Sequence, residues 1–376
     1  MGEAKHQPQD TTQDFLGWLQ NTKGAAEHSL SLALPGAQLQ VNCSDAFTAS
    51  TLRAYFQPWL TAPSALPATT VTIIESQPVG QELPWLDWTR EAGKTGRKDT
   101  FIDAPGVRLI RKYRTGMVFL QAPRNPIAIG PAAKNINQVV NFINNQAINA
   151  LQQDDWLIGH AAAASYNRQA IAIAGFSGGG KSTSMLQLLE HPAVNFVSND
   201  RIFIQPQAQQ LMLTGVAKMP RVNPGTLLHN PRLLALLSPA QQHRYKTLAP
   251  EQLWELEEKH DVMIPALYGK ADNPRIDNSA TLGAIMLLNW NRAEQSACRI
   301  QSVDIEARQD LLPALMKSPG PFYQDRQGNF HPNAQAPQPY LERLKHTQVY
   351  EVSGGVDFTE LRDFCWQLWG IPRSAP

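Results

Sequence analysis

The chain has 376 residues, 43% hydrophobic and 17% charged, and its 33 basic and 32 acidic side chains leave a formal net charge of +1. This length predicts a sizeable core and two domains rather than one. Because neither charge forms a long run, the composition argues against a nucleic-acid groove or an anionic membrane surface as partner. Cys43, Cys298 and Cys365 lie far apart, and no apolar run approaches the ~18 residues of a spanning helix, so we expect a cytoplasmic protein with reduced thiols.

The region before residue 130 predicts a small antiparallel sheet with one helix. Alternating apolar and polar residues with turn residues between them predict two hairpins and one further strand. These strands are expected at residues 29–34, 38–42, 69–76, 107–113 and 117–121. Apolar residues at helical spacing predict a helix at 45–60, capped by Ser44 or Asp45. We therefore expect a loose N-terminal segment over residues 1–28 and an α+β domain over 29–130 that carries no motif.

The clearest predicted helix spans residues 136–151, where apolar residues repeat at helical spacing along one side. The opposite face is rich in amide side chains, which we interpret as a solvated surface. These amides are Asn137, Gln138, Asn141, Asn144 and Asn145. Because this helix leads directly towards a glycine-rich loop, we place the boundary near residue 130 and expect the second domain over residues 131–376.

The glycine-rich loop at residues 175–183 reads GFSGGGKST and matches the phosphate-cradling pattern G-x-x-x-x-G-K-[ST]. An apolar strand is expected before it at 170–174 and a helix after it at 181–190, which is the context that the pattern needs. The residues expected to hold the phosphates are Gly175, Ser177, Gly178, Gly179, Gly180, Lys181, Ser182 and Thr183. The glycines let consecutive N–H groups point at an anion, and the helix adds the positive end of its dipole. Since Lys181 would reach the β/γ-phosphates and Ser182 would hold Mg²⁺, the loop predicts binding of a nucleoside triphosphate or a similar polyphosphate.

The region behind the loop alternates between strand and helix patterns and indicates an α/β domain. Strands are expected at residues 195–197, 201–205, 210–213, 281–288, 299–303 and 349–353. Helical pieces are expected at residues 231–237, 250–259, 305–316 and 357–368. The proline-rich stretch 318–339 is too long for an ordinary connection, so it is either an ordered functional loop or a flexible flap that closes over the site.

Asp200 and His160 are the first candidates for chemistry beside the loop. Asp200 follows the strand after the loop's helix, where a carboxylate can hold Mg²⁺ or take the proton of an attacking hydroxyl. The alternative is an ordinary loop-capping aspartate. His160, one strand before the loop, either contacts a phosphate and shuttles a proton or is a satisfied core or surface histidine.

Three further features are open to a functional and a structural interpretation. Arg221 is expected to pair with a phosphate or an acidic acceptor, or to form a structural salt bridge. We interpret the acidic cluster of Glu257, Glu258 and Asp261 as a solvated face. The run at 353–355, Ser-Gly-Gly, is interpreted as a plain turn.

The combination HAAAAS…GFSGGGKST…FVSNDRIFI resembles the kinase domain of HPr kinase/phosphorylase, and within its relatives the group called HprK-related kinase B. The similarity covers about residues 105–300 and is strongest from 156 to 205. It implies the compact α/β fold of that P-loop kinase, related to phosphoenolpyruvate carboxykinase, and phosphoryl transfer from ATP with Mg²⁺. The implied site residues are Ser182 and Asp200 at the metal, His160 at the transferring phosphate, Lys181 in the loop, and Arg201 and Arg221 at the substrate.

The chain departs from HPr kinase at one position of the site, because Asn199 and Asp200 stand where that kinase has two adjacent acids. Either Asp200 serves as both metal ligand and base, or a second acid comes from elsewhere, or transfer is weak. We therefore expect an ATP- and Mg²⁺-dependent kinase acting on a hydroxyl of an unidentified protein or small molecule. A nucleotide-binding regulatory module is the alternative. HPr is not the expected acceptor, since its docking signature is not visible, and a homo-oligomer is left open.

Overall fold

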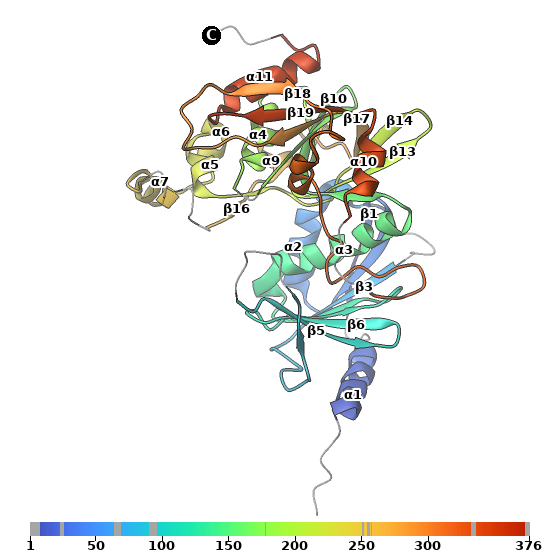
Figure 1. Cartoon of the computed structure of the whole chain (residues 1–376). Helices are drawn as coiled ribbons and strands as arrows, with labels where there is room; N and C mark the ends of the chain where they lie inside the picture. The colour runs from blue at the N-terminus through green and yellow to red at the C-terminus, as the bar shows by residue number, and fades with distance from the viewer. Residues whose placement is uncertain are drawn as a thin grey trace, which may run out of the picture. The chain divides into compact units, whose positions relative to one another are not determined.

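The computed structural model describes residues 8–22, 26–63, 69–89, 96–176, 178–249, 252–253, 256, 258–331 and 336–372. The structure is mixed α/β and divides into two compact units (Figure 1). The first unit comprises Met1–Asp154 with Pro319–Ala334, and the second comprises Asp155–Ser318 with Gln335–Pro376. Within the described ranges, no helix combines the length and apolar character that crossing a membrane requires.

The first unit contains a sheet with the strand order β1-β2-β3-β8-β7-β6-β5-β4. Its strands are β1 (His28–Leu34), β2 (Ala37–Cys43), β3 (Thr69–Glu75), β4 (Leu86–Asp87), β5 (Asp99–Ala104), β6 (Val107–Lys112), β7 (Val118–Gln121) and β8 (Ile127–Gly130). Both predicted hairpins are confirmed as the antiparallel pairs β1–β2 and β6–β7. The purely antiparallel sheet is wrong, however, because β3 runs parallel to both β2 and β8. A helix joins β2 to β3, and such a crossover returns the chain in the same direction.

Helices cover both faces of this sheet. They are α1 (Pro8–Asn21), α2 (Ala46–Tyr55) and α3 (Ile136–Gln153), with short 3₁₀ turns at η2 (Gln57–Trp59) and η3 (Ala133–Asn135). The side chain of Asp45 accepts a hydrogen bond from the Thr48 N–H and caps α2, as predicted. In α1, Leu16 and Leu19 join a buried cluster with strand residues such as Leu109 and Val118. Residues 8–21 are therefore a packed helix and not a loose segment, while residues 1–7 lie outside the described part.

The division between the units falls after Asp154, and not near residue 130, because α3 packs on the first sheet. Its residue Leu151, for example, fills the space beside Gly36 in the β1–β2 turn. The amide-rich face of α3 is not simply solvated: Asn144 is 2% exposed and donates to the Val140 carbonyl within the helix. Two residues on, Gln146 and Gln121 of β7 donate to each other's side-chain oxygens over 3.0 and 3.1 Å. This buried pair of glutamines therefore finds its hydrogen-bond partners inside the unit.

The described part of the proline-rich stretch is an ordered segment of the first unit. Phe322 lies edge-on to the ring of Phe119 at 5.7 Å and tilted against that of Phe142 at 5.8 Å. Asn149 of α3 donates to the Phe322 carbonyl, and Gln324 donates to the Gly106 carbonyl, each over 2.8 Å. Of the two alternatives, the ordered loop is therefore the one that the contacts support for residues 319–331.

The second unit contains a larger sheet that branches at one long strand. Its strands are β9 (Leu157–Gly159), β10 (Ala161–Tyr166), β11 (Gln169–Gly175), β12 (Asn195–Ser198), β13 (Ile202–Gln207), β14 (Gln210–Thr214), β17 (Ser279–Leu288), β18 (Arg299–Ser302) and β19 (Gln348–Ser353). The order is β12-β10-β11-β17-β14-β13-β9, and β19 pairs with both β17 and β18. The long strand is β17, and β11 pairs in parallel along one side of it. On the other side of β17, its first residues pair with β14 and its last residues pair with β19. A separate two-stranded sheet joins β15 (Arg221–Val222) to β16 (His260–Asp261).

Helices of the second unit confirm some predictions and correct others. They are α4 (Lys181–Leu188), α5 (Pro224–Leu228), α6 (Pro231–Leu234), α7 (Pro239–Lys246), α9 (Ile264–Leu267), α10 (Gln338–Leu344) and α11 (Phe358–Leu368), with the 3₁₀ helix η4 (Gln309–Ala314). The helix after the loop and the last helix lie where predicted. The helical piece expected at 305–316 is confirmed in part, as the shorter 3₁₀ helix η4, which has Pro313 inside it. The helix expected at 250–259 falls largely outside the described residues.

Strand directions bring several segments to one edge of the second sheet. Because β11, β17 and β19 are parallel and β12 runs antiparallel to β10, the carboxyl ends of these four strands share an edge with the start of β10. This edge carries the glycine-rich loop after β11, Asp200 after β12, and His160 before β10. It also carries Trp290 after β17. Ligands of open α/β sheets bind at the carboxyl ends of strands, so this edge positions the candidate site.

Candidate functional site

The glycine-rich loop runs from the end of β11 to the first residue of α4, as the sequence predicts. Gly178 and Gly180 have φ angles of 80° and 92°, a conformation that side chains rarely adopt. At Gly180 a Cβ would also lie 2.8 Å from the Phe358 ring, so this position admits no larger residue without a shift. The N–H of Gly179 donates to the Phe176 carbonyl over 3.0 Å and closes the turn. Ser177 lies outside the described residues.

Lys181 folds back over the loop that it follows. Its Nζ donates to the Gly175 carbonyl over 2.7 Å and to the Phe176 carbonyl over 3.3 Å. Burial lowers the pKa of Lys181 to about 8; the charge of Asp200 opposes this change and that of Lys317 adds to it. Burial disfavours the protonated amine, whereas an anion beside Nζ would favour it. The two opposite charges would then stabilise each other.

The two hydroxyl residues after Lys181 have different surroundings. The Oγ1 of Thr183 shares a hydrogen bond of 2.9 Å with the Oγ1 of Thr226 in α5, so Thr183 ties the loop's helix to the neighbouring segment. Ser182 is partly exposed at the first turn of α4. Of the two hydroxyls, that of Ser182 is therefore the one open to a metal ion.

Asp200 lies between His160 and Arg201. Its Oδ1 is 3.6 Å from the Nε2 of His160, and its Oδ2 is 3.6 Å from the Nε of Arg201. The side chain of Asp200 is 44% exposed, against 23% for His160. Burial by itself would raise the pKa of Asp200, but His160, Arg201 and Lys218 together hold that pKa well below its usual range. Asp200 is therefore an ionised carboxylate across the physiological pH range.

Backbone contacts fix the positions of His160 and of the turn that carries Asp200. The N–H of His160 donates to the Leu315 carbonyl over 2.7 Å. In the turn, the hydroxyl of Ser198 donates to the Arg201 carbonyl and accepts from the N–H of Val216 over 3.3 Å. Gly215 permits this approach, because a Cβ there would lie 1.9 Å from the Val197 carbonyl oxygen. The segment after β14 thus supports the end of β12.

Lys218 belongs to the site and carries no motif that the sequence could reveal. Burial lowers the pKa of Lys218; the charge of Asp200 opposes this, while Arg201, Arg221 and Lys259 lower the pKa further. Lys218 and these neighbouring cations thus add positive charge to the part of the second unit that carries Asp200. Such an excess of positive charge suits a polyanionic ligand.

Arg221 forms the structural salt bridge that was the alternative to substrate binding. Its Nε lies 2.9 Å from the Oδ1 of Asp261, and its Nη2 donates to the Lys259 carbonyl over 3.3 Å. The acidic cluster is divided between partners: Asp261 pairs with Arg221, and Glu258 pairs with Arg244 over 2.6 Å. Glu257 lies outside the described residues. Arg201, by contrast, is brought directly to Asp200.

Aromatic and basic residues from the end of β17 hold the other side of the loop. The indole N–H of Trp290 donates to the Gly179 carbonyl over 2.8 Å, and Arg292 donates to the Gly178 carbonyl over 3.4 Å. The Trp290 ring packs edge-on against Phe358, the first residue of α11, at 5.2 Å. Sequence reasoning missed these contacts, because the three residues lie more than a hundred positions beyond the loop.

The donor set of the site is compatible with a nucleoside triphosphate and Mg²⁺. The loop supplies a glycine cradle, and Lys181 and Lys218 supply partly desolvated cations. Oxygen donors, which Mg²⁺ prefers, come from Ser182 and Asp200. Asn199, which precedes Asp200 in the chain, adds a third oxygen. Its side-chain oxygen is buried without a hydrogen-bond partner. Among the residues described, no group of three or more His, Cys, Asp and Glu side chains forms a metal cage.

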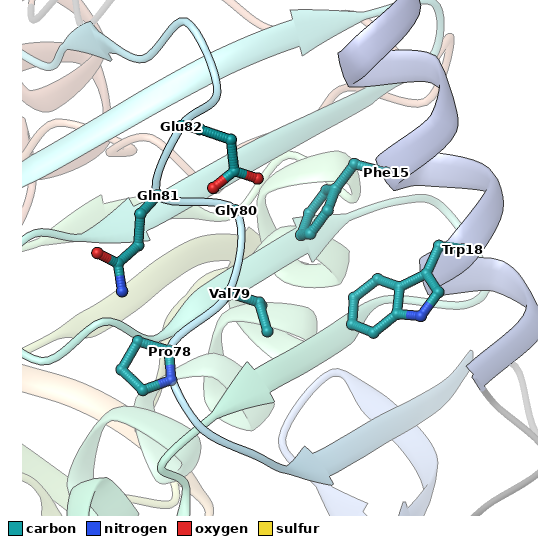
Figure 2. A pocket seen from close by; sticks show the side chains of 7 residues that line it. All are labelled: Phe15, Trp18, Pro78, Val79, Gly80, Gln81 and Glu82. Atoms are coloured by element: carbon teal, nitrogen blue, oxygen red, sulfur yellow. The ribbon is translucent and has the colours of Figure 1, made fainter.

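A hollow of about 460 Å³ lies in the first unit, and none of the predicted site residues line it. Figure 2 shows Phe15 and Trp18 of α1 facing the segment 78–82. Its walls carry one carboxylate, Glu82, and no cation. This hollow has none of the charge that a phosphate ligand requires.

Comparison with solved structures gives a distant structural likeness. No protein-family model and no curated protein matches the chain. The solved structure of the Hpr(Ser) kinase/phosphatase from Coxiella burnetii is similar with a TM-score of 0.26 and 13% identity. The match covers 57% of this chain and 93% of that one. The function proposed below therefore rests on the residues of this chain.

Proposed function

We propose that this chain is an ATP- and Mg²⁺-dependent phosphotransferase that moves the γ-phosphate to a hydroxyl of a protein or small-molecule acceptor. One observation carries the proposal: the glycine-rich loop with Lys181 follows β11, Asp200 follows β12, and the register of both strands with β10 brings the two to one sheet edge. The loop offers N–H groups and a helix start to phosphates, and the carboxylate lies where an acceptor would approach. The likeness in motif to HPr kinase agrees with this assignment.

In this proposal the chain's residues hold, orient and neutralise the reactants. The bond between Pγ and its bridging oxygen breaks, a bond from the acceptor oxygen to Pγ forms, the nucleoside diphosphate leaves, and the proton of the acceptor hydroxyl is released to solvent. Lys181 and Lys218 would neutralise phosphate charge, and His160 would contact the transferring group. Mg²⁺ bound by Ser182 and Asp200 would neutralise the charge that develops on the phosphate oxygens.

Asp200 is better suited to orienting the acceptor than to being a strong base. Its pKa lies below the usual range, so the carboxylate is ionised but has little affinity for a proton. Phosphoryl transfer passes through a loose transition state, in which the attacking hydroxyl keeps much of its proton. A weak base that fixes the direction of the hydroxyl is therefore sufficient. Arg201 beside Asp200 would contact the acceptor or its phosphate, and Arg221 would do so only if its bond to Asp261 opened.

The second candidate function is a regulatory module that binds the nucleotide and transfers phosphate slowly or not at all. Asn199 favours it, because an amide stands in place of a second carboxylate beside Asp200. A neutral ligand binds Mg²⁺ more weakly than a carboxylate does and cannot accept a proton at neutral pH. Binding of Mg²⁺-ATP without any transfer would support this candidate.

Transfer from ATP labelled at the γ-phosphate, in an extract of the source cells, tests the proposal. Wild-type protein should label a discrete protein or metabolite, and Lys181→Ala should lower that transfer by about a hundredfold or more, because a phosphate-neutralising cation is lost. Lys270→Ala, which removes an exposed lysine outside the site, is the matched control and should transfer normally. Full transfer by Lys181→Ala would refute the site, and label released only as phosphate would favour the regulatory module.

A further inference from the structure

A cavity of about 300 Å³ lies in the second unit next to the glycine-rich loop. Its walls come from the segment after β17 and from the turn between β19 and α11, including Arg292, Glu294, Ser296, Ala297 and Asp357. We propose that this cavity receives the nucleoside, the base with its ribose, of the nucleotide whose phosphates lie in the loop. The inference rests on the proposed function, because it takes the loop to be the phosphate site.

The order of the strands gives the direction of the nucleotide. β11, which ends in the loop, lies between β10 on one side and β17 on the other. His160 and Asp200 lie on the β10 side, where β12 follows, so the reacting end of the phosphate chain belongs there. The cavity lies on the β17 and β19 side. A nucleotide that crosses the end of β11 therefore places its nucleoside over the cavity.

Direct contacts join the cavity wall to the loop. Arg292, one of the lining residues, donates to the Gly178 carbonyl over 3.4 Å. The opposite wall is fixed by the N–H of Gly355, which donates to the Ser296 carbonyl over 3.0 Å. Trp290 and Phe358 border the loop at Gly179 and Gly180 and come from the same two segments as the cavity walls. Gly355, the last residue of the run at 353–355, is thus part of the cavity wall.

The lining chemistry suits a nucleoside and disfavours a phosphate. The hydroxyl of Ser296 donates to Oε1 of Glu294 over 2.5 Å, and the N–H of Thr359 donates to Oδ1 of Asp357 over 2.9 Å. The second oxygens of the two carboxylates would accept from ribose hydroxyls or from amino groups of the base. Of the lining charges, the guanidinium of Arg292 donates to the Gly178 carbonyl of the loop, and the two carboxylates would repel phosphate, whereas the Lys181 and Lys218 side attracts it. The volume is at the lower end of ligand pockets and matches a single nucleoside.

Filling the cavity separates nucleoside binding from phosphate binding. Ala297 lines it and is exposed, so Ala297→Phe should fill the space without disturbing the core. Ala293→Phe places the same ring at an exposed position of the same segment that does not line the cavity. Isothermal titration calorimetry would measure the affinity of the wild-type protein and of each variant for Mg²⁺-ATP and for Mg²⁺-tripolyphosphate. Asp357→Ser, which keeps a capping hydroxyl for α11, provides a second variant.

The expected result is a selective loss of the nucleoside contribution. Ala297→Phe should weaken ATP about tenfold or more and leave tripolyphosphate within about twofold, while Ala293→Phe changes neither. Asp357→Ser should weaken ATP in the same selective way. Unchanged ATP affinity in Ala297→Phe, or wild-type protein binding tripolyphosphate as tightly as ATP, would overturn the cavity assignment and leave the phosphate site standing. Wild-type protein that binds neither ligand would overturn both.

Discussion

The two sides of the glycine-rich loop differ in charge and in shape. On the β10 and β12 side, Lys218 and Arg201 gather around one carboxylate, Asp200. On the β17 and β19 side, aromatic rings hold the loop and two carboxylates line a cavity. Under the proposed function, this difference would help the loop to orient its ligand, with the reacting phosphate on the cationic side.

The largest effect that separates the two sides is expected from Asp200→Asn. Transfer should fall by about a hundredfold or more, because the acceptor hydroxyl loses the group that orients it. The affinity for ATP measured without Mg²⁺ should stay the same or rise, since a negative charge leaves a phosphate site, whereas the affinity for Mg²⁺-ATP should fall with the loss of a metal ligand. Steady-state transfer and isothermal titration measure the two quantities. Asp272→Asn, at an exposed aspartate in the turn after Lys270, is the control and should change neither. Equal losses of transfer and of ATP binding without Mg²⁺ would show that Asp200 only supports the fold.

A smaller effect is expected from pH, through Lys181. In the empty site its pKa is lowered to about 8 by burial, and bound phosphate should return it towards the ordinary 10.5. Because the protonated form of Lys181 binds phosphate, the affinity for ATP should be highest below pH 8 and fall about fivefold between pH 8 and 9. In that range, binding of ATP should take up protons. Titration in buffers of different ionisation enthalpy measures this uptake. Lys181→Arg, which stays charged, should lose the dependence; if it keeps the same pH profile, another group is responsible.

The smallest effect concerns the aromatic side. Trp290→Phe keeps a ring against Phe358 but removes the donor to the Gly179 carbonyl, so the free energy of unfolding should drop by about 0.5–1.5 kcal/mol. Chemical denaturation measures it. Trp369→Phe serves as the comparison, because it makes the same exchange at a tryptophan whose ring lies 6.3 Å from the ring of Tyr166. A loss that is no greater in Trp290→Phe than in Trp369→Phe would mean that the bond to the loop contributes nothing.

The sequence predicted the residues of the site that belong to a local pattern. The loop between β11 and α4, and the placing of Asp200 after a strand, follow from spacing and from hydrophobic runs. Lys218, Trp290 and Arg292 could not be found in this way, because strand order and not chain neighbourhood brings them to the loop. The cavity near Ala297 was hidden for the same reason.

The errors in the fold have similar causes. Alternation predicts strands but says nothing of their partners, so the parallel pairing of β3 with β2 and β8 was missed. The unit boundary was misplaced because α3 packs on the sheet that precedes it in the chain, and not on the sheet that follows it. The segment 319–331 also belongs to the first unit, although it lies far along the chain. At 305–316 the helical piece is shorter than the apolar spacing suggested, a 3₁₀ helix that has Pro313 inside it.

Photolabelling tests the direction of the nucleotide most directly. One probe would be ATP with an azide on the adenine ring, and the other ATP with an azidoanilide on the γ-phosphate, each crosslinked with Mg²⁺ and mapped by peptide mass spectrometry. The account predicts that the adenine probe labels peptides that contain Trp290–Cys298 or the turn at 353–357. The γ-phosphate probe should label peptides around His160, Asp200 or Lys218. The reverse pattern, or both probes on the same peptides, would contradict the account.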